Sequence, residues 1–250
     1  QVDVTTLDID RVLCADGELL AERSGATQRF VEADVTQLDR SLPSGGHTVA
    51  RHACGHLHRS LVDQAAARRM VALDVAPCCY YRGLEGDYQP LSGSLLTRVT
   101  ADDARLAVTE SVTAAPRQVR QRDREMALKL GFDTWRRQSS GADEYRSFKP
   151  VPAAWMRGRF ADFMALMVQR EMLALPGERR MDELERRGWQ RQREVMRLSI
   201  MRNAFRRPLE IWLALDLAVR LENDGYSVRL GRFCERRLTP RNLLISARLN

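Results

Sequence analysis

The sequence predicts an α/β protein with a doubly wound sheet and a helical insertion. Over the first part of the chain, short apolar runs alternate with helix-compatible segments, which is typical of parallel β-α-β units. From 101 to 205 the patterns are almost entirely helical. At 206–250 an apolar helix precedes two strand-like segments. We therefore expect a core formed by 1–100 and 206–250, with 101–205 as an inserted helical part.

The chain opens with two strands joined by a helix. Val2–Asp10 alternates and ends in acids, so we expect a buried parallel strand here. Arg11–Arg23 follows with a helical pattern that Gly25 ends. Arg29–Val31 is the second strand, and it leads to Asp34. The apolar face of the helix consists of Val12, Leu13, Leu19 and Leu20.

A second β-α-β unit follows a glycine-containing loop. The strand expected at Val49–Arg51 leads into His52–Gly55, and a helix is expected at Leu57–Met70. The next strand, Val71–Ala76, leads into Pro77–Tyr80. Because ligands gather at the carboxyl ends of parallel strands, these two loops predict a binding site.

The remaining elements are helices and two closing strands. Helices are expected at 102–112, 117–130, 159–173, 181–187 and 189–204. The residues expected to separate them are Pro116, Gly131, Pro150, Pro152, Pro176 and Gly188. Leu209–Leu221 is apolar almost all round, so we expect a buried helix that returns to the sheet. Tyr226–Phe233 and Asn242–Leu249 then have strand patterns.

The composition is that of an ordinary globular protein. Hydrophobic residues make up 44% of the chain and charged residues 29%. No apolar run approaches the roughly 20 residues that a membrane helix needs, and the start lacks a secretory signal pattern. We therefore expect a cytoplasmic protein without membrane contact. The five cysteines of such a chain favour free thiols over a disulfide framework.

Positive charge is carried almost entirely by arginine. The formal net charge is +7, and lysine occurs only at Lys129 and Lys149, which leaves 38 arginines among the 40 basic residues. The planar guanidinium suits phosphate and stacks on bases, so this composition favours a nucleic-acid partner. A GC-rich genome would produce the same excess of arginine, and both explanations remain open.

Five segments together carry a resemblance to a known family. They are HACG at 52–55, PCCY at 77–80, QRDREM at 121–126, FRRPLE at 205–210 and LTPRNLL at 238–244. The chain resembles a bacterial group of class I S-adenosylmethionine-dependent methyltransferases, related to the methyltransferase-like 25 proteins of eukaryotes. The resemblance implies a Rossmann-like sheet with an antiparallel terminal strand pair. The family often has a histidine where Tyr81 stands here, so the role of that histidine is not transferred.

The resemblance implies S-adenosylmethionine as the cofactor and indicates which residues hold it. Asp8 would accept hydrogen bonds from the ribose hydroxyls, with Asp10 as a second candidate, and Asp34 would bind the adenine amino group. The expected cofactor-binding residues are Asp8, Ile9, Asp34, Val35, His52, Ala53 and Gly55. The alternatives are a helix-capping role for Asp8 or Asp10 and a solvated loop position for Asp34.

The two loops would form the reacting end. The expected catalytic residues there are His52, Cys54, Cys79 and Tyr80. His52 is a candidate donor or base near neutral pH, and Tyr80 is a candidate for stacking on a planar substrate. Buried, unreactive cysteines are the alternative for the thiols. His56 and His58 are expected to be surface residues of the first helical turn.

The same loops contain enough ligand types for zinc. The possible ligands are His52, Cys54, His56, His58, Cys78 and Cys79. Their spacing is not that of a repeated CxxC pair, and a zinc site needs four ligands converging at about 2.0–2.3 Å. From the sequence we therefore predict no metal site.

RNA is the expected substrate, from the basic charge and by analogy with RNA-modifying relatives. Arg117, Arg120 and Arg124 recur at spacings of three and four and would form one basic stripe. The alternative for this stripe is a solvated face that includes Asp123 and Glu125. Two other functions remain open: a non-catalytic RNA-binding or scaffold module, and a small-molecule methyltransferase.

The glycine-rich loop that normally wraps the methionine part of the cofactor is missing. No GxGxG-like segment precedes Val2, and Gly45 and Gly46 lie in the wrong place to replace it. The expectation is that the sequence starts after the first β-α unit, or that the protein is a degenerate member that binds the cofactor poorly.

Overall fold

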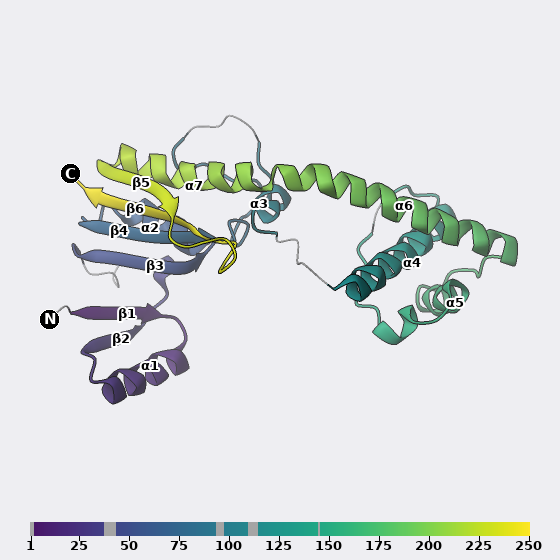
Figure 1. Cartoon of the computed structure of the whole chain (residues 1–250), viewed down its shortest axis with the longest axis horizontal. Helices are drawn as coiled ribbons and strands as arrows, with labels where there is room; N and C mark the ends of the chain where they lie inside the picture. The colour runs from purple at the N-terminus through teal and green to yellow at the C-terminus, as the bar shows by residue number, and fades with distance from the viewer. Residues whose placement is uncertain (1–2, 38–43, 94–97, 110–114, 145) are drawn as a thin grey trace. The chain divides into compact units, whose positions relative to one another are not determined.

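The structure is a computed structural model that describes residues 3–37, 44–93, 98–109, 115–144 and 146–250. The chain forms two compact units (Figure 1). Gln1–Glu110 and Phe205–Asn250 make up the first, which contains the described strands, and Ser111–Ala204 makes up the second, which is helical. Among the described helices, none has both the length and the apolar character needed to cross a membrane.

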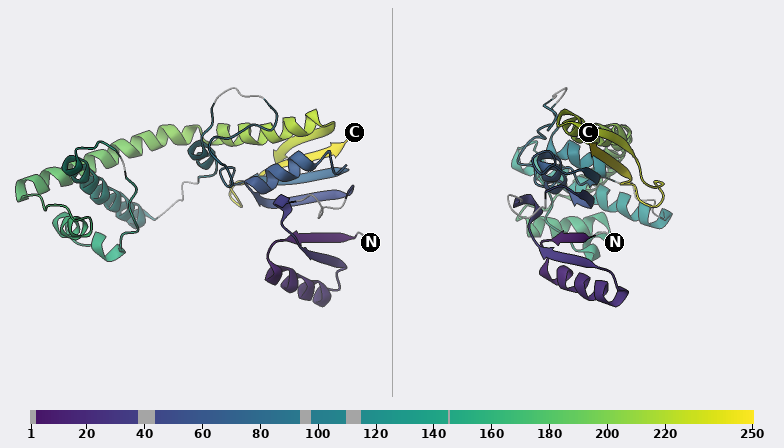
Figure 2. Two further views of the ribbon diagram at one scale, coloured as in Figure 1. Left: turned by 180° about the vertical axis from the view of Figure 1, so that it is seen from behind. Right: turned by 90° about the vertical axis from the view of Figure 1, so that its left-hand side faces the viewer.

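The first unit contains two sheets, where the sequence predicted one. β1 (Val4–Asp8) and β2 (Gln28–Glu32) form a parallel pair, and α1 (Arg11–Ser24) packs against them (Figures 1 and 2). The second sheet has the strand order β3-β4-β6-β5. Among the described residues, β1 pairs with β2 and β3 pairs with β4, and no ladder joins β1 to β3.

The β1–β2 pair is more exposed than the buried parallel strand that the sequence predicted. Every residue of β1 is at least partly exposed, and in α1 only Cys14 and Ala21 are buried. The apolar face expected for this helix is between 51% and 67% exposed, at Val12, Leu13, Leu19 and Leu20. The helix is present as predicted, but it packs on the strands through the face with Cys14, Gly17 and Ala21, where a Cβ at Gly17 would lie 2.3 Å from the Phe30 ring.

The larger sheet is mixed. β3 (His47–Cys54) and β4 (Ala72–Cys78) are parallel, and β6 (Leu243–Leu249) is antiparallel to both β4 and β5 (Tyr226–Arg232). The antiparallel terminal pair is therefore confirmed. One side of the sheet points into the core through fully buried side chains at Leu73, Val75, Ile245 and Ala247.

Three helices share this core with the sheet. They are α2 (His56–Gln64), α3 (Ala101–Val108) and α7 (Arg206–Asn223). In α7 the residues at the core are Leu213, Leu217 and Leu221, whereas Ile211, Leu215 and Val219 remain between 37% and 44% exposed. The helix that the sequence predicted to be buried all round is therefore buried on one face only.

The opposite side of the sheet carries a polar ladder across three strands. Asp74 on β4 is hydrogen-bonded to His47 Nε2 on β3 at 2.6 Å, and it accepts from Ser246 and from Arg248 Nη2 at 3.2 Å on β6. Burial opposes ionisation of Asp74, but these hydrogen bonds outweigh it and hold its pKa below the usual value. The doubly wound prediction required helices on both sides of the sheet. In the described part of the chain, helices cover this sheet only on its apolar side.

Asp216 on α7 fastens the segment that follows β4. Its carboxylate accepts hydrogen bonds from the Tyr88 hydroxyl at 2.7 Å and from the Leu91 and Ser92 backbone amides, both at 3.0 Å. Tyr88 also meets Trp212 edge to face, with ring centroids 5.9 Å apart. Burial, followed by the charge of Asp216, raises the pKa of Tyr88, so this hydroxyl remains a neutral donor.

In its described residues, the second unit contains two long helices, one shorter helix and a short 3-10 helix. They are α4 (Pro116–Ser140), η2 (Ala153–Met156), α5 (Phe160–Arg170) and α6 (Glu178–Ala204). Its core is aromatic and methionine-rich, with fully buried side chains at Phe132, Phe163, Met164 and Met167. Met adapts to irregular gaps, which suits a core built between helices of unequal length.

Two glycines that the sequence predicted to separate helices lie inside continuous ones. α4 runs through Gly131 and α6 runs through Gly188. A Cβ at Gly188 would lie 2.3 Å from the carbonyl oxygen of Ala127 and 3.0 Å from the nitrogen of Gly131. The two helices therefore cross with their backbones in contact. Glycine is needed here because it lets the two helix backbones approach closely. The sequence pattern did not distinguish this role from a helix break.

Candidate active site

The carboxyl ends of β3 and β4 bring the two predicted loops together. The register of the pair shifts between Arg51 and Cys54, so that Cys54 lies opposite Cys78. The irregularity gives His52 a φ of 59°, in the left-handed region that non-glycine residues rarely adopt. The exposed imidazole of His52 comes within 4.0 Å of the Cys78 sulfur, measured from Nδ1. A bulge at this point re-aims a side chain that would otherwise alternate across the sheet.

Gly55 locks the first loop against the second. Its amide donates to the carbonyl of Cys78 at 3.0 Å, and the next amide, of His56, donates to the carbonyl of Arg82 at 3.1 Å. Gly55 has φ 55° and ψ −115°, a backbone conformation essentially restricted to glycine. A Cβ there would lie 2.1 Å from the Arg82 carbonyl oxygen. The HACG loop needs glycine at this position for both reasons.

Three thiols converge between these loops. The sulfurs of Cys54 and Cys78 are 3.3 Å apart, and those of Cys54, Cys78 and Cys79 all lie within 4.8 Å of one another. Cys78 is buried, whereas Cys54 and Cys79 are partly exposed. Burial and then the neighbouring Cys54 raise the pKa of both Cys78 and Cys79. Without a cation, these two groups are neutral thiols near pH 7.

Tyr80 does not occupy the exposed position that the sequence predicted. Its side chain is fully buried, and its ring meets that of His58 edge to face at 5.3 Å. Burial raises its pKa well above the usual value. A ring enclosed in this way has no face available for stacking on a substrate. Tyr81, the next residue, is only partly buried and lies under the guanidinium of Arg105, 4.8 Å from the ring centroid.

His58 is a core residue, although the sequence predicted an exposed one. It is fully buried, and its Nδ1 is 2.8 Å from the carbonyl oxygen of Ala53, so the neutral ring donates there. Burial lowers the pKa of His58 to about 4. The ring thereby supports the HACG loop from beneath. His56 is exposed, as predicted.

We expect His58 to make folding sensitive to mild acid. Because its pKa is about 4 in the folded state and about 6.5 when unfolded, the unfolded chain binds more protons between these values. Stability should therefore fall by about 2 kcal/mol between pH 7 and pH 5 from this group alone. An NMR titration of the ring and urea unfolding at the two pH values test this. In His58→Asn, which keeps a donor near Ala53, the pH dependence from this group should vanish, and its persistence would contradict the assignment.

The predicted cofactor aspartates also lie at strand ends. Asp8 is the last residue of β1, and its Oδ1 accepts from the amide of Asp10 at 2.8 Å. Asp10 caps α1 by accepting from the amide of Val12 at 2.8 Å, so the capping alternative applies to Asp10. Ile9 between them is 68% exposed.

Asp34 follows β2 and begins the turn into η1 (Val35–Gln37). It accepts from both the amide and the hydroxyl of Thr36, at 2.9 and 2.7 Å. Val35 packs against the main core, and η1 contacts α2. The short helix that follows Asp34 therefore contacts the helix that starts directly after the HACG loop.

Residues 1–84 match a family described as a methyltransferase domain. No curated protein and no solved structure matches the chain significantly.

The match supports a methyltransferase. The methyltransferase segment includes both pairs of strand ends, and thus Asp8, Asp34 and the HACG and PCCY loops. The α/β architecture of the first unit, a mixed sheet with helices, is consistent with a methyltransferase fold. The sequence did not indicate that Cys78 would meet both Cys54 and His52, because that contact depends on the register shift at the end of β3.

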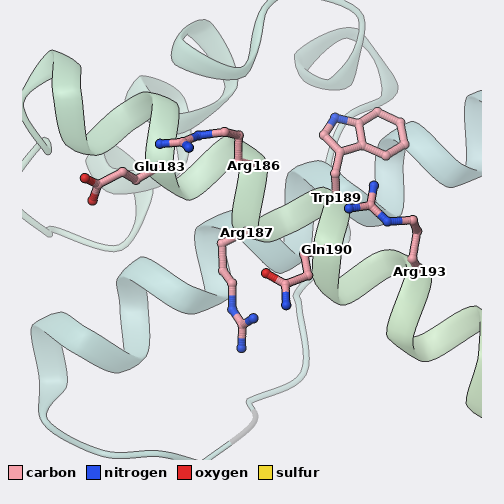
Figure 3. A pocket seen from close by; sticks show the side chains of 6 residues that line it. All are labelled: Glu183, Arg186, Arg187, Trp189, Gln190 and Arg193. Carbon is pink, nitrogen blue, oxygen red and sulfur yellow. The ribbon is translucent and has the colours of Figure 1, made fainter.

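The helical unit has a shallow depression on α6 (Figure 3). Its lining residues are Glu183, Arg186, Arg187, Trp189, Gln190 and Arg193. Arg186, Trp189 and Arg193 are spaced by three and four residues and project from one side of the helix in Figure 3. A half-buried indole with two guanidinium groups is a composition that suits a planar, phosphate-bearing group.

The basic stripe predicted on α4 is divided between two roles. Arg117 and Arg120 are exposed near the start of the helix. Arg124 instead donates to the backbone carbonyls of Arg157, at 3.3 Å, and Gly158, and so fastens α4 to the turn before α5. Arg124, one of the three arginines predicted to contact RNA, is therefore engaged in hydrogen bonds within the helical unit.

Proposed function

We propose that the protein is an S-adenosylmethionine-dependent methyltransferase of the methyltransferase-like 25 related group, acting on RNA. The observation that carries the proposal is the methyltransferase-domain match over residues 1–84. Methyltransferase domains generally use S-adenosylmethionine, and the matched segment supplies acidic residues after two parallel strands. Asp8 would accept hydrogen bonds from the ribose hydroxyls, and Asp34 would accept one from the adenine amino group. Ile9 and Val35 would lie beside the adenine ring.

The reacting end would be the pair of loops after β3 and β4. Methyl transfer is a displacement at the sulfonium carbon, and catalysis depends mainly on holding acceptor and methyl group in line. The backbone of Ala53 and Gly55 would approach the cofactor, while His52, Cys54 and Cys79 would form the wall that faces the acceptor. The fixed hydrogen bonds between the loops supply the rigidity that such positioning needs.

A further β-α unit would complete the fold between β1 and β3. Both strands have one unpaired edge in the described residues. Each also belongs to a parallel pair, β1 with β2 and β3 with β4. Apolar side chains near these edges are exposed, among them Val4 at 45% on β1 and Val49 at 69% on β3. An inserted parallel strand would pair both edges, and its helix would cover the open side of the sheet. This unit would also supply the glycine-rich loop for the methionine part of the cofactor.

RNA is favoured by how charge is distributed along the chain. The helical unit has 20 basic and 12 acidic residues, a net charge of +8, whereas the rest of the chain has 20 basic and 21 acidic residues. A strongly positive unit in a chain whose remaining residues are nearly neutral is the charge distribution expected of a protein that binds a polyanion. A GC-rich genome would also raise the number of arginines, but it would not concentrate net positive charge in one of the two units.

Calorimetry with S-adenosylhomocysteine tests the cofactor role. We expect the protein to bind S-adenosylhomocysteine, and Asp8→Asn to weaken binding at least about tenfold, since a charge-assisted bond to ribose is worth about 1.5–3 kcal/mol. Asp16→Asn, an exposed change on the neighbouring α1, is the matched control. Absence of binding would favour the scaffold alternative.

The salt dependence of RNA affinity tests the substrate class. We expect affinity for a single-stranded RNA oligonucleotide to fall steeply with salt, and the double change Arg186→Gln with Arg193→Gln to reduce the slope by about 2. Arg23→Gln with Arg29→Gln removes the same charge from exposed positions of the other unit. Equal effects of the two pairs, or no salt dependence, would contradict an RNA role for α6 and favour a small-molecule acceptor.

A further inference from the structure

We propose that Cys54, Cys78, Cys79 and His52 bind one Zn²⁺ ion and that this metal clamps the loops after β3 and β4. This inference goes beyond the proposed function, because it concerns metal binding and not methyl transfer. It reverses the prediction from sequence spacing. The reversal rests on where the folded chain places the four side chains.

The separations of the sulfurs fit a tetrahedral thiolate site. With Zn–S bonds of about 2.3 Å, two sulfurs of a tetrahedral site lie about 3.8 Å apart. Here the Cys54 and Cys78 sulfurs are 3.3 Å apart, and all three sulfurs lie within 4.8 Å of one another. Sulfur movements of up to about 1 Å, which side-chain rotations can supply, would bring the three onto one ion. Among the described residues, this is the only such cluster of three or more possible ligands.

His52 supplies the fourth position. In the same geometry an imidazole nitrogen and a sulfur lie about 3.6 Å apart, and His52 Nδ1 is 4.0 Å from the Cys78 sulfur. The exposed ring lies beside Cys78 but outside the group of three sulfurs, so it would have to rotate toward the ion to bind it. Four protein ligands of the Cys₃His type are typical of closed, structural zinc sites.

The electrostatic surroundings suit the charged complex. Zn²⁺ with three thiolates and a neutral imidazole has a net charge of −1. Arg82 interacts electrostatically with Cys79 and Cys54, and Arg241 interacts with Cys79. These guanidinium groups would offset the excess negative charge without competing for the metal, since arginine has no free lone pair to offer. Soft thiolate ligands favour zinc over magnesium or calcium.

The alternative for two of the thiols is a disulfide between Cys54 and Cys78. That bond would need the sulfurs to approach to about 2.05 Å and would leave Cys79 and His52 without a shared role. It is an outcome that the experiment distinguishes.

The test measures metal in the purified protein and its replacement by cobalt. We expect about one equivalent of zinc by mass spectrometry. Co²⁺ added after chelation should produce thiolate-to-cobalt charge-transfer absorption and intense tetrahedral d–d bands. Cys54→Ser and Cys79→Ser should lose both signals, whereas Cys234→Ser, a partly buried thiol outside the cluster, should keep them. His52→Ala should weaken cobalt affinity at least about tenfold, with exposed His56→Ala as its control.

Failure is visible in the unaltered protein, whether or not a variant folds. Background metal content together with no cobalt–thiolate absorption would overturn the proposal. A Cys54–Cys78 disulfide found by peptide mapping of the freshly purified, non-reduced protein would also overturn it. Neither readout depends on cofactor binding or methyl transfer, so the metal site and the proposed function stand or fall separately.

Discussion

Replacing Gly55 with alanine is expected to destabilise the larger sheet by about 3 kcal/mol or more. The backbone conformation of Gly55, with φ 55° and ψ −115°, costs a non-glycine residue about 1–3 kcal/mol, and overpacking against fixed atoms adds about 1–3 kcal/mol. The obstructing atom is the backbone carbonyl oxygen of Arg82, 2.1 Å from the added Cβ, so no side-chain rotation relieves the clash. Hydrogen exchange of the β4 amides measures the loss, because these amides report opening of the sheet.

Gly45→Ala is the matched control for this change. Gly45 also has a positive φ, 76°, and precedes the same sheet, but a Cβ there would meet nothing within 4 Å. Its cost should be limited to the backbone contribution of about 1–2 kcal/mol. Equal losses for the two variants would show that the contact between the HACG and PCCY loops contributes nothing to stability.

Replacing Asp133 with asparagine is expected to cost the helical unit about 3–5 kcal/mol, the usual consequence of removing one partner from a buried ion pair. Asp133 on α4 has no exposed side-chain surface and lies 2.8–2.9 Å from the guanidinium groups of Arg136, Arg137 and Arg191. Arg191 belongs to α6, so the carboxylate joins the two long helices. Its loss would leave three cations facing one another, with Arg136 only 7% exposed.

Tryptophan fluorescence during urea unfolding reports on this unit, since Trp135, Trp155 and Trp189 lie within it. Asp143→Asn is the matched control. Asp143 pairs with the same Arg137 at 2.7 Å but is 95% exposed, so its removal should cost less than about 1 kcal/mol. If the two variants unfold at the same urea concentration, the buried cluster is not the link between α4 and α6.

Local patterns in the sequence predicted the kinds of elements well. The alternation of β1, the apolar run of β4 and the periodicity of α7 each produced the expected element, because hydrophobic period reflects backbone geometry directly. Cap residues were also informative: Asp10 begins α1 and Gly25 ends it. The glycines at 131 and 188 misled, since a helix tolerates glycine wherever another backbone must pass close by.

The candidate site was only partly predictable. That His52 and Cys54 follow one strand and Cys78 and Cys79 the next was evident from the sequence. Whether their atoms meet depends on the bulge in β3, the left-handed residues and the Gly55 contact, and each of these arises from pairing with a distant segment. The burial of Tyr80 and His58 also depends on distant segments. Their neighbours in the sequence are ordinary, and only packing beneath the loops encloses the two rings.

The sequence by itself thus determined which residue types follow each strand, because strand ends and turns are local properties of the chain. Tertiary structure alone decided which side chains share a space, which are exposed, and that three thiols converge with an imidazole beside one of them. Distances of a few ångströms between residues more than 20 positions apart are set by register and packing, which no local pattern records.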